Sequence, residues 1–187
     1  MTELRYALVF GISAGILLLA SLATPLISIE HSFPGYNQAD TKLEISCGLF
    51  QSDSNIDLSE MGVASCAALI KKINADNNAI FFVMPSGVTP QLEVIDYVGI
   101  VILVLCTAAL IIRSLFQTLF TLILARYCFL ASACLGIVLV NATLGAVQSL
   151  HAAPDPGAQT SCQIGTAFLM LAGTPLVALT TGIRKRS

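Results

Sequence analysis

The centre of this sequence is the segment Leu43-Glu44-Ile45-Ser46-Cys47-Gly48-Leu49-Phe50, which lies in the only long polar region of a strongly apolar chain. Apolar residues occupy every second position through most of this segment, and that alternation predicts a β-strand with one buried face. Ile27 and Ile29 show the same spacing at the end of the first apolar run, and Pro34-Gly35 predicts a turn between the two strands. We therefore expect a small β-containing segment with its apolar face against the rest of the molecule.

The composition places the remainder of the chain in a membrane. Apolar residues make up 56% of the 187 residues and charged residues only 11%, whereas a soluble domain carries about 25% charged residues. So few charges cannot cover a water-facing surface, so lipid must be part of the solvent. Four strongly apolar runs lack Asp, Glu, Lys, Arg and His, namely residues 6–29, 97–112, 127–150 and 156–183.

These runs predict the fold class. A helix needs about 20 apolar residues to cross the hydrocarbon core. We expect a single domain over residues 1–187, an all-α transmembrane four-helix bundle with a small extramembrane β-containing segment between the first and second spans. The expected spans are residues 6–27, 97–116, 127–147 and 164–183.

Two arginines define the connection between the second and third spans. Arg113 can snorkel, which lets the second span continue to about residue 116. A tight turn is expected between Arg113 and Arg126. The alternative, a longer helix that contains Arg126, is costly if the arginine reaches the bilayer centre; we prefer the tight turn.

The basic residues predict the orientation of the chain. One side of the membrane receives six of them: Arg5, Arg113, Arg126, Arg184, Lys185 and Arg186. Ten of the eleven acidic residues fall on the other side. We expect a multi-pass protein with both termini on the cytoplasmic side, an outer segment at residues 28–95 and a short outer loop at 149–162. The plasma membrane is the preferred location and an organelle membrane the alternative.

The outer segment also predicts a helix that begins at about residue 58. Asp57 suits the N-cap and Glu60 the capping-box position. The apolar spacing i, i+3, i+4, i+7 gives this helix a packed face, formed by Cys66, Leu69, Ile70 and Ile73. Residues 80–84 are a candidate third strand.

Three cysteines, Cys47, Cys66 and Cys162, are expected on the outer side, where an oxidising compartment permits a disulfide. They allow three single pairings. We favour Cys47–Cys66, which ties a strand to the helix beside it. The other three cysteines lie within spans and are interpreted as small apolar filler.

The spans carry pairs of small residues that suit close helix contact. These pairs are Gly11/Gly15, Ser132/Gly136 and Ala178/Gly182. They serve either packing within the chain or contact with another protein. Asn141, the most polar residue within a span, is interpreted as an interhelical hydrogen-bond donor.

Catalytic and ligand-binding motifs are absent from the sequence. It has no P-loop, GxGxxG, HExxH or CxxC, and we expect no enzyme activity, no cofactor, no metal and no nucleic-acid partner. His31 and His151 could meet near Glu30 or Asp155 as a metal or proton site, but we interpret them as polar residues at the membrane interface. Ionisable residues are missing from the span cores, which disfavours an ion-coupled transporter.

An acidic surface is predicted between Cys47 and Cys66, formed by Asp53, Asp57 and Glu60. It could meet a basic partner, and the alternative is a solvated charged face. Beyond membrane lipid, the expected partners are other integral membrane proteins or a second copy of the chain.

Residues Ala23-Thr24-Pro25 end the first span, Cys47-Gly48-Leu49-Phe50 follows in the outer segment, and Cys66 comes next. With four spans, a long first and short second outer segment and inner termini, this layout resembles the claudin, peripheral-myelin-protein and amastin superfamily. Claudins carry Gly-Leu-Trp followed by two cysteines; here Phe50 replaces the Trp and one cysteine precedes the Gly. The resemblance implies adhesion, a junction pore or an auxiliary subunit of a membrane complex.

Three functions are therefore compared. The first is a non-enzymatic tetraspan that binds protein partners in the membrane and through the outer segment. The second is an accessory subunit of an organellar bioenergetic complex. The third is a pore or transporter, which needs a water-filled path.

Overall fold

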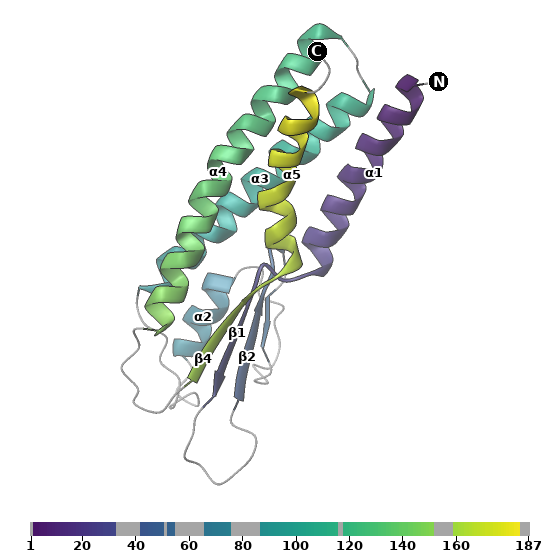
Figure 1. The fold of residues 1–187 in the computed structure, drawn as a ribbon. Coiled ribbons are helices and arrows are strands. Elements are labelled where there is room, and N and C mark those ends of the chain that lie inside the picture. The colour runs from purple at the N-terminus through teal and green to yellow at the C-terminus, as the bar shows by residue number, and fades with distance from the viewer. Residues whose placement is uncertain are drawn as a thin grey trace.

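The computed structural model describes residues 2–32, 42–50, 52–54, 66–75, 87–115, 118–151 and 159–183. The helices are α1 (Thr2–Ala23), α2 (Cys66–Ala75), α3 (Val88–Leu115), α4 (Leu119–His151) and α5 (Thr166–Ile183). The strands are β1 (Ile27–Ser32), β2 (Lys42–Cys47), β3 (Ser52–Ser54) and β4 (Gln159–Ile164). The four long helices, α1, α3, α4 and α5, lie side by side, and a small sheet extends from one end of them (Figure 1).

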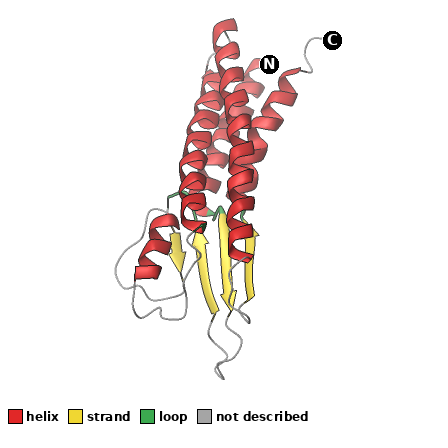
Figure 2. Ribbon diagram, turned by 90° about the vertical axis from the view of Figure 1, so that its left-hand side faces the viewer, coloured by secondary structure: helices red, strands yellow, loops and turns green. Residues whose placement is uncertain are grey.

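Helix α3 is the centre of the bundle. It packs against α1 and α4, and α5 closes the bundle through contacts with α4, α1 and α3. The short helix α2 lies beside the sheet and packs against α3 (Figure 2). Of the expected fold class, the mostly helical character and the small β-containing segment are confirmed, and the segment is an antiparallel sheet.

Buried hydroxyl groups in the bundle are satisfied within their own helices. Each donates to the carbonyl oxygen four residues earlier at 2.6 to 2.8 Å, which removes the cost of burying an unpaired polar group. These residues are Ser21, Thr107, Ser132 and Thr143.

Two helices, α3 and α4, are each long and apolar enough to cross a membrane. The described parts of α1 and α5 contain shorter apolar helices, Leu8–Ala23 and Thr166–Leu179. Helix α3 begins at Val88, nine residues before the expected span, so Glu93 and Asp96 belong to the same helix as the apolar run that follows them.

The chain passes from one helix to the next between Arg113 and Arg126, as expected, because α3 ends at Leu115 and α4 begins at Leu119. The expected start of the third span at residue 127 is wrong, and the alternative of a longer helix that contains Arg126 is observed. Helix α4 runs without a break through Arg126, which is exposed near the start of a 33-residue helix. Such a helix is about 50 Å long, whereas the hydrocarbon core is about 30 Å thick. The excess length lets Arg126 stay away from the bilayer centre. Arg113 lies with its guanidinium 4.4 Å from the centroid of the Phe10 ring of α1.

The sheet confirms the two predicted strands. Its order is β3-β2-β1-β4 with antiparallel pairing throughout, and Ile29 lies opposite Ile45. The alternation has the expected effect, because Ile27, Ile29, Ile45 and Cys47 are buried on one face. Polar side chains occupy the opposite face.

Strand β4 corrects the expected loop at residues 149–162. Residues 159–164 pair with β1 along its whole length, with Cys162 opposite Ile29. The segment between α4 and α5 therefore adds an edge strand to the sheet formed by the segment between α1 and α2. The short segment Gln159–Ile164 is rich in polar residues, and its hydrogen-bonding partner lies far away in sequence.

Helix α2 has the predicted buried face at Cys66, Leu69 and Ile70. The expected helix start at residue 58, with Asp57 as the N-cap and Glu60 beside it, lies outside the described residues. The candidate strand at residues 80–84 also lies outside them. The third strand that the structure describes is β3, at Ser52–Ser54.

Two helix-to-strand connections meet where the bundle joins the sheet. The Leu26 amide donates to the Cys47 carbonyl oxygen at 2.6 Å, and the Gly165 amide donates to the Leu26 carbonyl oxygen at 2.8 Å. A Cβ atom on Gly165 would lie 1.9 Å from the Pro25 carbonyl oxygen. Only glycine allows α5 to begin this close to the end of α1.

Gly165→Ala is therefore expected to destabilise the protein by about 3 kcal/mol, near the upper end of overpacking effects, because backbone atoms must move. The matched control is Gly173→Ala in α5, where an added Cβ meets no atom within 4 Å. Thermal unfolding in detergent measures both variants. Equal melting temperatures for the two would contradict the proposed close contact.

Candidate functional site

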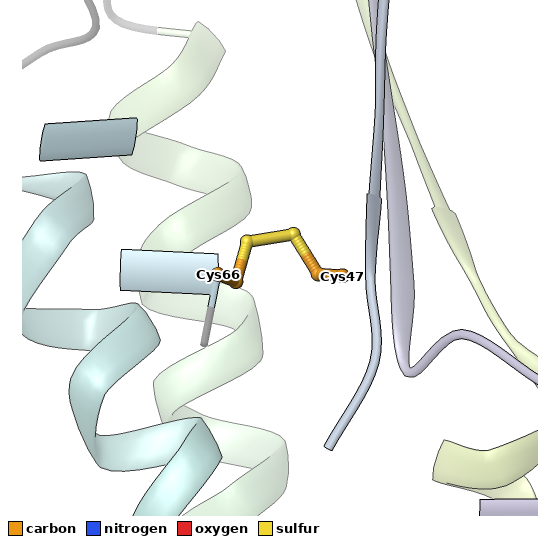
Figure 3. The surroundings of a disulfide bond; sticks show 2 residues. All are labelled: Cys47 and Cys66. Atoms are coloured by element: carbon orange, nitrogen blue, oxygen red, sulfur yellow. A yellow bond between two sulfur atoms is a disulfide. The ribbon is translucent and has the colours of Figure 1, made fainter. Parts of the chain in front are cut away.

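The disulfide between Cys47 and Cys66 confirms the favoured pairing (Figure 3). It joins the end of β2 to the first residue of α2, across 19 residues of sequence and with 5.0 Å between the two Cα atoms. Both cysteines are buried. The third cysteine that was expected outside, Cys162, is free and half-buried on β4, and burial raises the pKa of its thiol.

The carboxyl group of Asp96 lies at the first turn of α2. The backbone amides of Cys66 and Ala67 donate hydrogen bonds to it, so a residue of α3 caps α2 from outside that helix. Asp96 is 8% exposed, and its Oδ2 atom has no hydrogen-bond partner among the described residues. The sequence showed Asp96 only as the last charge before an apolar run.

Burial sets the protonation of this carboxyl group. Asp96 directly precedes the uncharged run at residues 97–112. Loss of hydration raises the pKa of Asp96 to about 6, the two amide hydrogen bonds lower the pKa, and the charge of Glu93 raises it further. The group therefore titrates close to neutral pH.

A second polar contact joins the same two helices. Lys71 of α2 forms an ion pair with Glu93 of α3, and both side chains are exposed. Exposed ion pairs contribute at most about 1 kcal/mol. This pair therefore orients α2 more than it stabilises it.

The face of the sheet that lies opposite the buried residues is polar. A hollow of about 250 Å³ on this face is lined by Ser28, Ile29, Glu30, Glu44, Ile45, Ser46, Ser161 and Gln163. Glu30 lies directly opposite Glu44 in the register, and Asp53 of β3 lies opposite Ser46. Three carboxylates therefore share one face of the sheet.

This arrangement bears on the predicted acidic surface. Asp53 is exposed on β3, whereas Asp57 and Glu60 lie outside the described residues. The structure thus places Asp53 with Glu30 and Glu44, two residues that the sequence did not assign to this surface. Strand pairing brings the three carboxylates together, and the order of charges along the sequence does not show this pairing.

The predicted helix-contact residues divide into two groups. Gly11 and Gly15 border open space, since a Cβ added at either would meet no atom within 4 Å. By contrast, Ser132 and Ala178 are buried. Gly136 is buried as well, although a Cβ added there would also meet no atom within 4 Å. Ser132 forms a hydrogen bond with the Cys106 side chain of α3 and so serves contact within the chain.

Two further predicted residues have different surroundings. Asn141 is exposed on α4, so its predicted hydrogen bond to another helix stays a prediction for a partner. Gly182 lies in α5, and its surroundings are outside the described residues.

The histidine hypothesis depends on side chains that the structure does not describe. His31 lies in β1, and His151 is the last residue of α4. Within the described part of the chain, no group of three or more His, Cys, Asp or Glu residues could hold a metal ion.

Replacing both disulfide cysteines, as Cys47→Ala/Cys66→Ala, is expected to lower the free energy of unfolding by about 3 kcal/mol, because a closed loop of this length restricts the unfolded chain. The control is Cys134→Ala, which removes an exposed free cysteine of α4 and should leave stability unchanged. Chemical denaturation measures the difference. Free thiols at both positions in unreduced native protein would show that the pairing is wrong.

Comparison with known proteins adds no family to this description. No protein-family model matches the chain, and no curated protein matches it. The likeness to the claudin layout therefore stays a prediction based on the residues quoted above.

Proposed function

We propose that the protein is a four-span integral membrane protein that works by associating with other membrane proteins or with a second copy of itself. The surfaces of all four long helices suit contact with lipid, because each helix carries large exposed apolar side chains. Examples are Leu19 of α1, Val104 of α3, Ile137 of α4 and Val177 of α5, all more than half exposed. In water such a surface would be unfavourable; in lipid it is the expected one.

The distribution of charge supports inner termini and an outer sheet. The start of α1, the ends of α3 and α5 and the start of α4 lie at the end of the bundle away from the sheet (Figure 1). Arg113 and Arg126 belong to that end of α3 and α4. The carboxylates of the sheet face and of Glu93 belong to the other end, which agrees with the excess of basic residues expected inside.

The observation that carries the association proposal is the open glycine face of α1. Ala14, Leu17 and Ser21 form the buried side of this helix. Gly11 and Gly15, four residues apart and so on one face, border open space. The chain's own packing therefore leaves this face available.

Such a face matters in lipid for a physical reason. The hydrophobic effect does not drive apolar helices together there, so association depends on close van der Waals contact, which small residues permit. Leu8 and Leu22 lie seven residues before and after Gly15 and are exposed. They lie on the same stripe of the helix as the glycines, above and below them, where a second helix could contact all four residues.

The buried polar groups favour association over a pore. In the described part of the bundle, the buried polar side chains that follow residue 96 are hydroxyls bonded along their own helices. Because their hydrogens are already donated within the helices, these hydroxyls are poor donors to water along a pore. The sheet is a second surface for association, with a partner in water. Its three carboxylates suit a basic partner.

Gly15→Leu is expected to reduce the recovery of associated membrane protein, second copies included, by about tenfold, a coupling of about 1.4 kcal/mol. The fold should be retained, because open space surrounds the site. Ile16→Leu, at an exposed neighbouring position, is the matched control. Recovery after crosslinking in mild detergent measures both.

Undiminished recovery with Gly15→Leu would contradict the use of this face. Transport or substrate turnover by the purified protein alone would overturn the association proposal as a whole.

A further inference from the structure

Helix α2 is held to the rest of the molecule at two places of different kind. Its first residue is covalently bonded to β2 through the disulfide. Its first turn is bonded to α3 only through the hydrogen bonds from the Cys66 and Ala67 amides to Asp96. The sheet attachment is therefore permanent in oxidising conditions. The attachment to α3 is non-covalent, and Asp96 is its buried polar contact, beside the exposed Lys71–Glu93 ion pair.

That carboxyl group is only partly satisfied. Two backbone amides donate to it, yet Oδ2 is buried and has no partner among the described residues. A buried carboxylate needs hydrogen bonds or an opposite charge to offset its lost hydration. The neutral carboxyl group loses less hydration free energy on burial than the carboxylate does. It can still accept hydrogen bonds from the α2 amides.

The charged groups on the elements packed around Asp96 do not stabilise its ionised form. On α3 the neighbour is Glu93, whose like charge disfavours ionised Asp96. On α2, Lys71 is already paired with Glu93, and Lys72 lies near the end of the helix. Asp53 of β3 is exposed.

We infer that the contact between α2 and α3 is a proton-controlled latch, which is closed when the Asp96 carboxyl group is neutral and opens more readily when it is ionised. The disulfide retains α2 on the sheet when the latch opens. The movement would thus loosen α2 from the membrane-facing helix without freeing it from the sheet. This inference concerns the outer segment and does not depend on the association proposed above.

The direction of the pH effect follows from linkage. The pKa of Asp96 is 3.8 in its ordinary environment and about 6 when it is buried here, so the docked state binds the proton more tightly. The docked state is therefore most favoured below the ordinary pKa and loses that advantage as the pH rises through the folded pKa. Between about pH 5 and about pH 7 the opening equilibrium is expected to rise about tenfold.

Hydrogen exchange of the intact protein in lipid nanodiscs tests the latch. After correction for the intrinsic exchange rate, the amides of Cys66 and Ala67 should open about tenfold more at pH 7 than at pH 5. Asp96→Asn should remove this dependence, because an amide oxygen accepts the same hydrogen bonds and does not titrate. Glu93→Gln is the matched control, which removes a neighbouring charge and should retain the dependence.

Opening that is independent of pH in the native protein would overturn the inference, and so would a dependence that survives Asp96→Asn. If the Asn variant does not fold, the carbon resonance of the Asp96 carboxyl group in the native protein decides the question. Titration near pH 6 supports the latch, and titration near 3.8 contradicts it.

Discussion

The backbone junction at Leu26 is the interaction on which the rest of the structure depends. Its carbonyl oxygen accepts from Gly165 at the start of α5, and its amide donates to Cys47 at the end of β2. Cys47 is bonded to Cys66, and the first turn of α2 is bonded to Asp96 of α3. One continuous path of hydrogen bonds and a disulfide thus links α5, the end of α1, the sheet, α2 and α3. Because the path returns to the bundle, it fixes the sheet relative to the helices.

The two halves of the molecule follow different rules of burial. In the bundle, apolar side chains lie on the surface as well as inside, and buried hydroxyls bond to their own helices. In the sheet, one face is apolar and packed while the other carries Glu30, Glu44 and polar neighbours. This contrast is the one expected where one half meets lipid and the other meets water.

Local patterns predicted the parts of the fold that local physics determines. The alternation around Ile45 specified a strand, and the helical spacing of Cys66, Leu69 and Ile70 specified the buried face of α2. The disulfide followed from placing one cysteine on each. The predictions failed where distant segments decide the structure. Strand β4 depends on pairing with β1, and Asp96 caps a helix whose first residue lies 30 positions earlier in the sequence.

Length rather than pattern misled the interpretation of Arg126. A charge at the edge of an apolar run was taken to end a span, but α4 is long enough to carry an exposed arginine beyond the hydrocarbon. The close approach at Gly165 was also invisible in the sequence, because a single glycine after a polar segment has many uses. At the candidate site, the spacing of Gly11 and Gly15 in the sequence identified them as contact residues. Only the structure shows that no neighbouring atom would meet a Cβ at either position.

The most direct test of the central claim, that the sheet lies outside a membrane-spanning bundle, is the labelling of single introduced cysteines on intact cells with a membrane-impermeant maleimide. The free native cysteines are first replaced by alanine, and the disulfide is kept. A cysteine at Ser161, which is exposed on β4, should react from outside, and one at Lys185 should react only after permeabilisation. Reaction of both positions from the same side would contradict the proposed membrane topology.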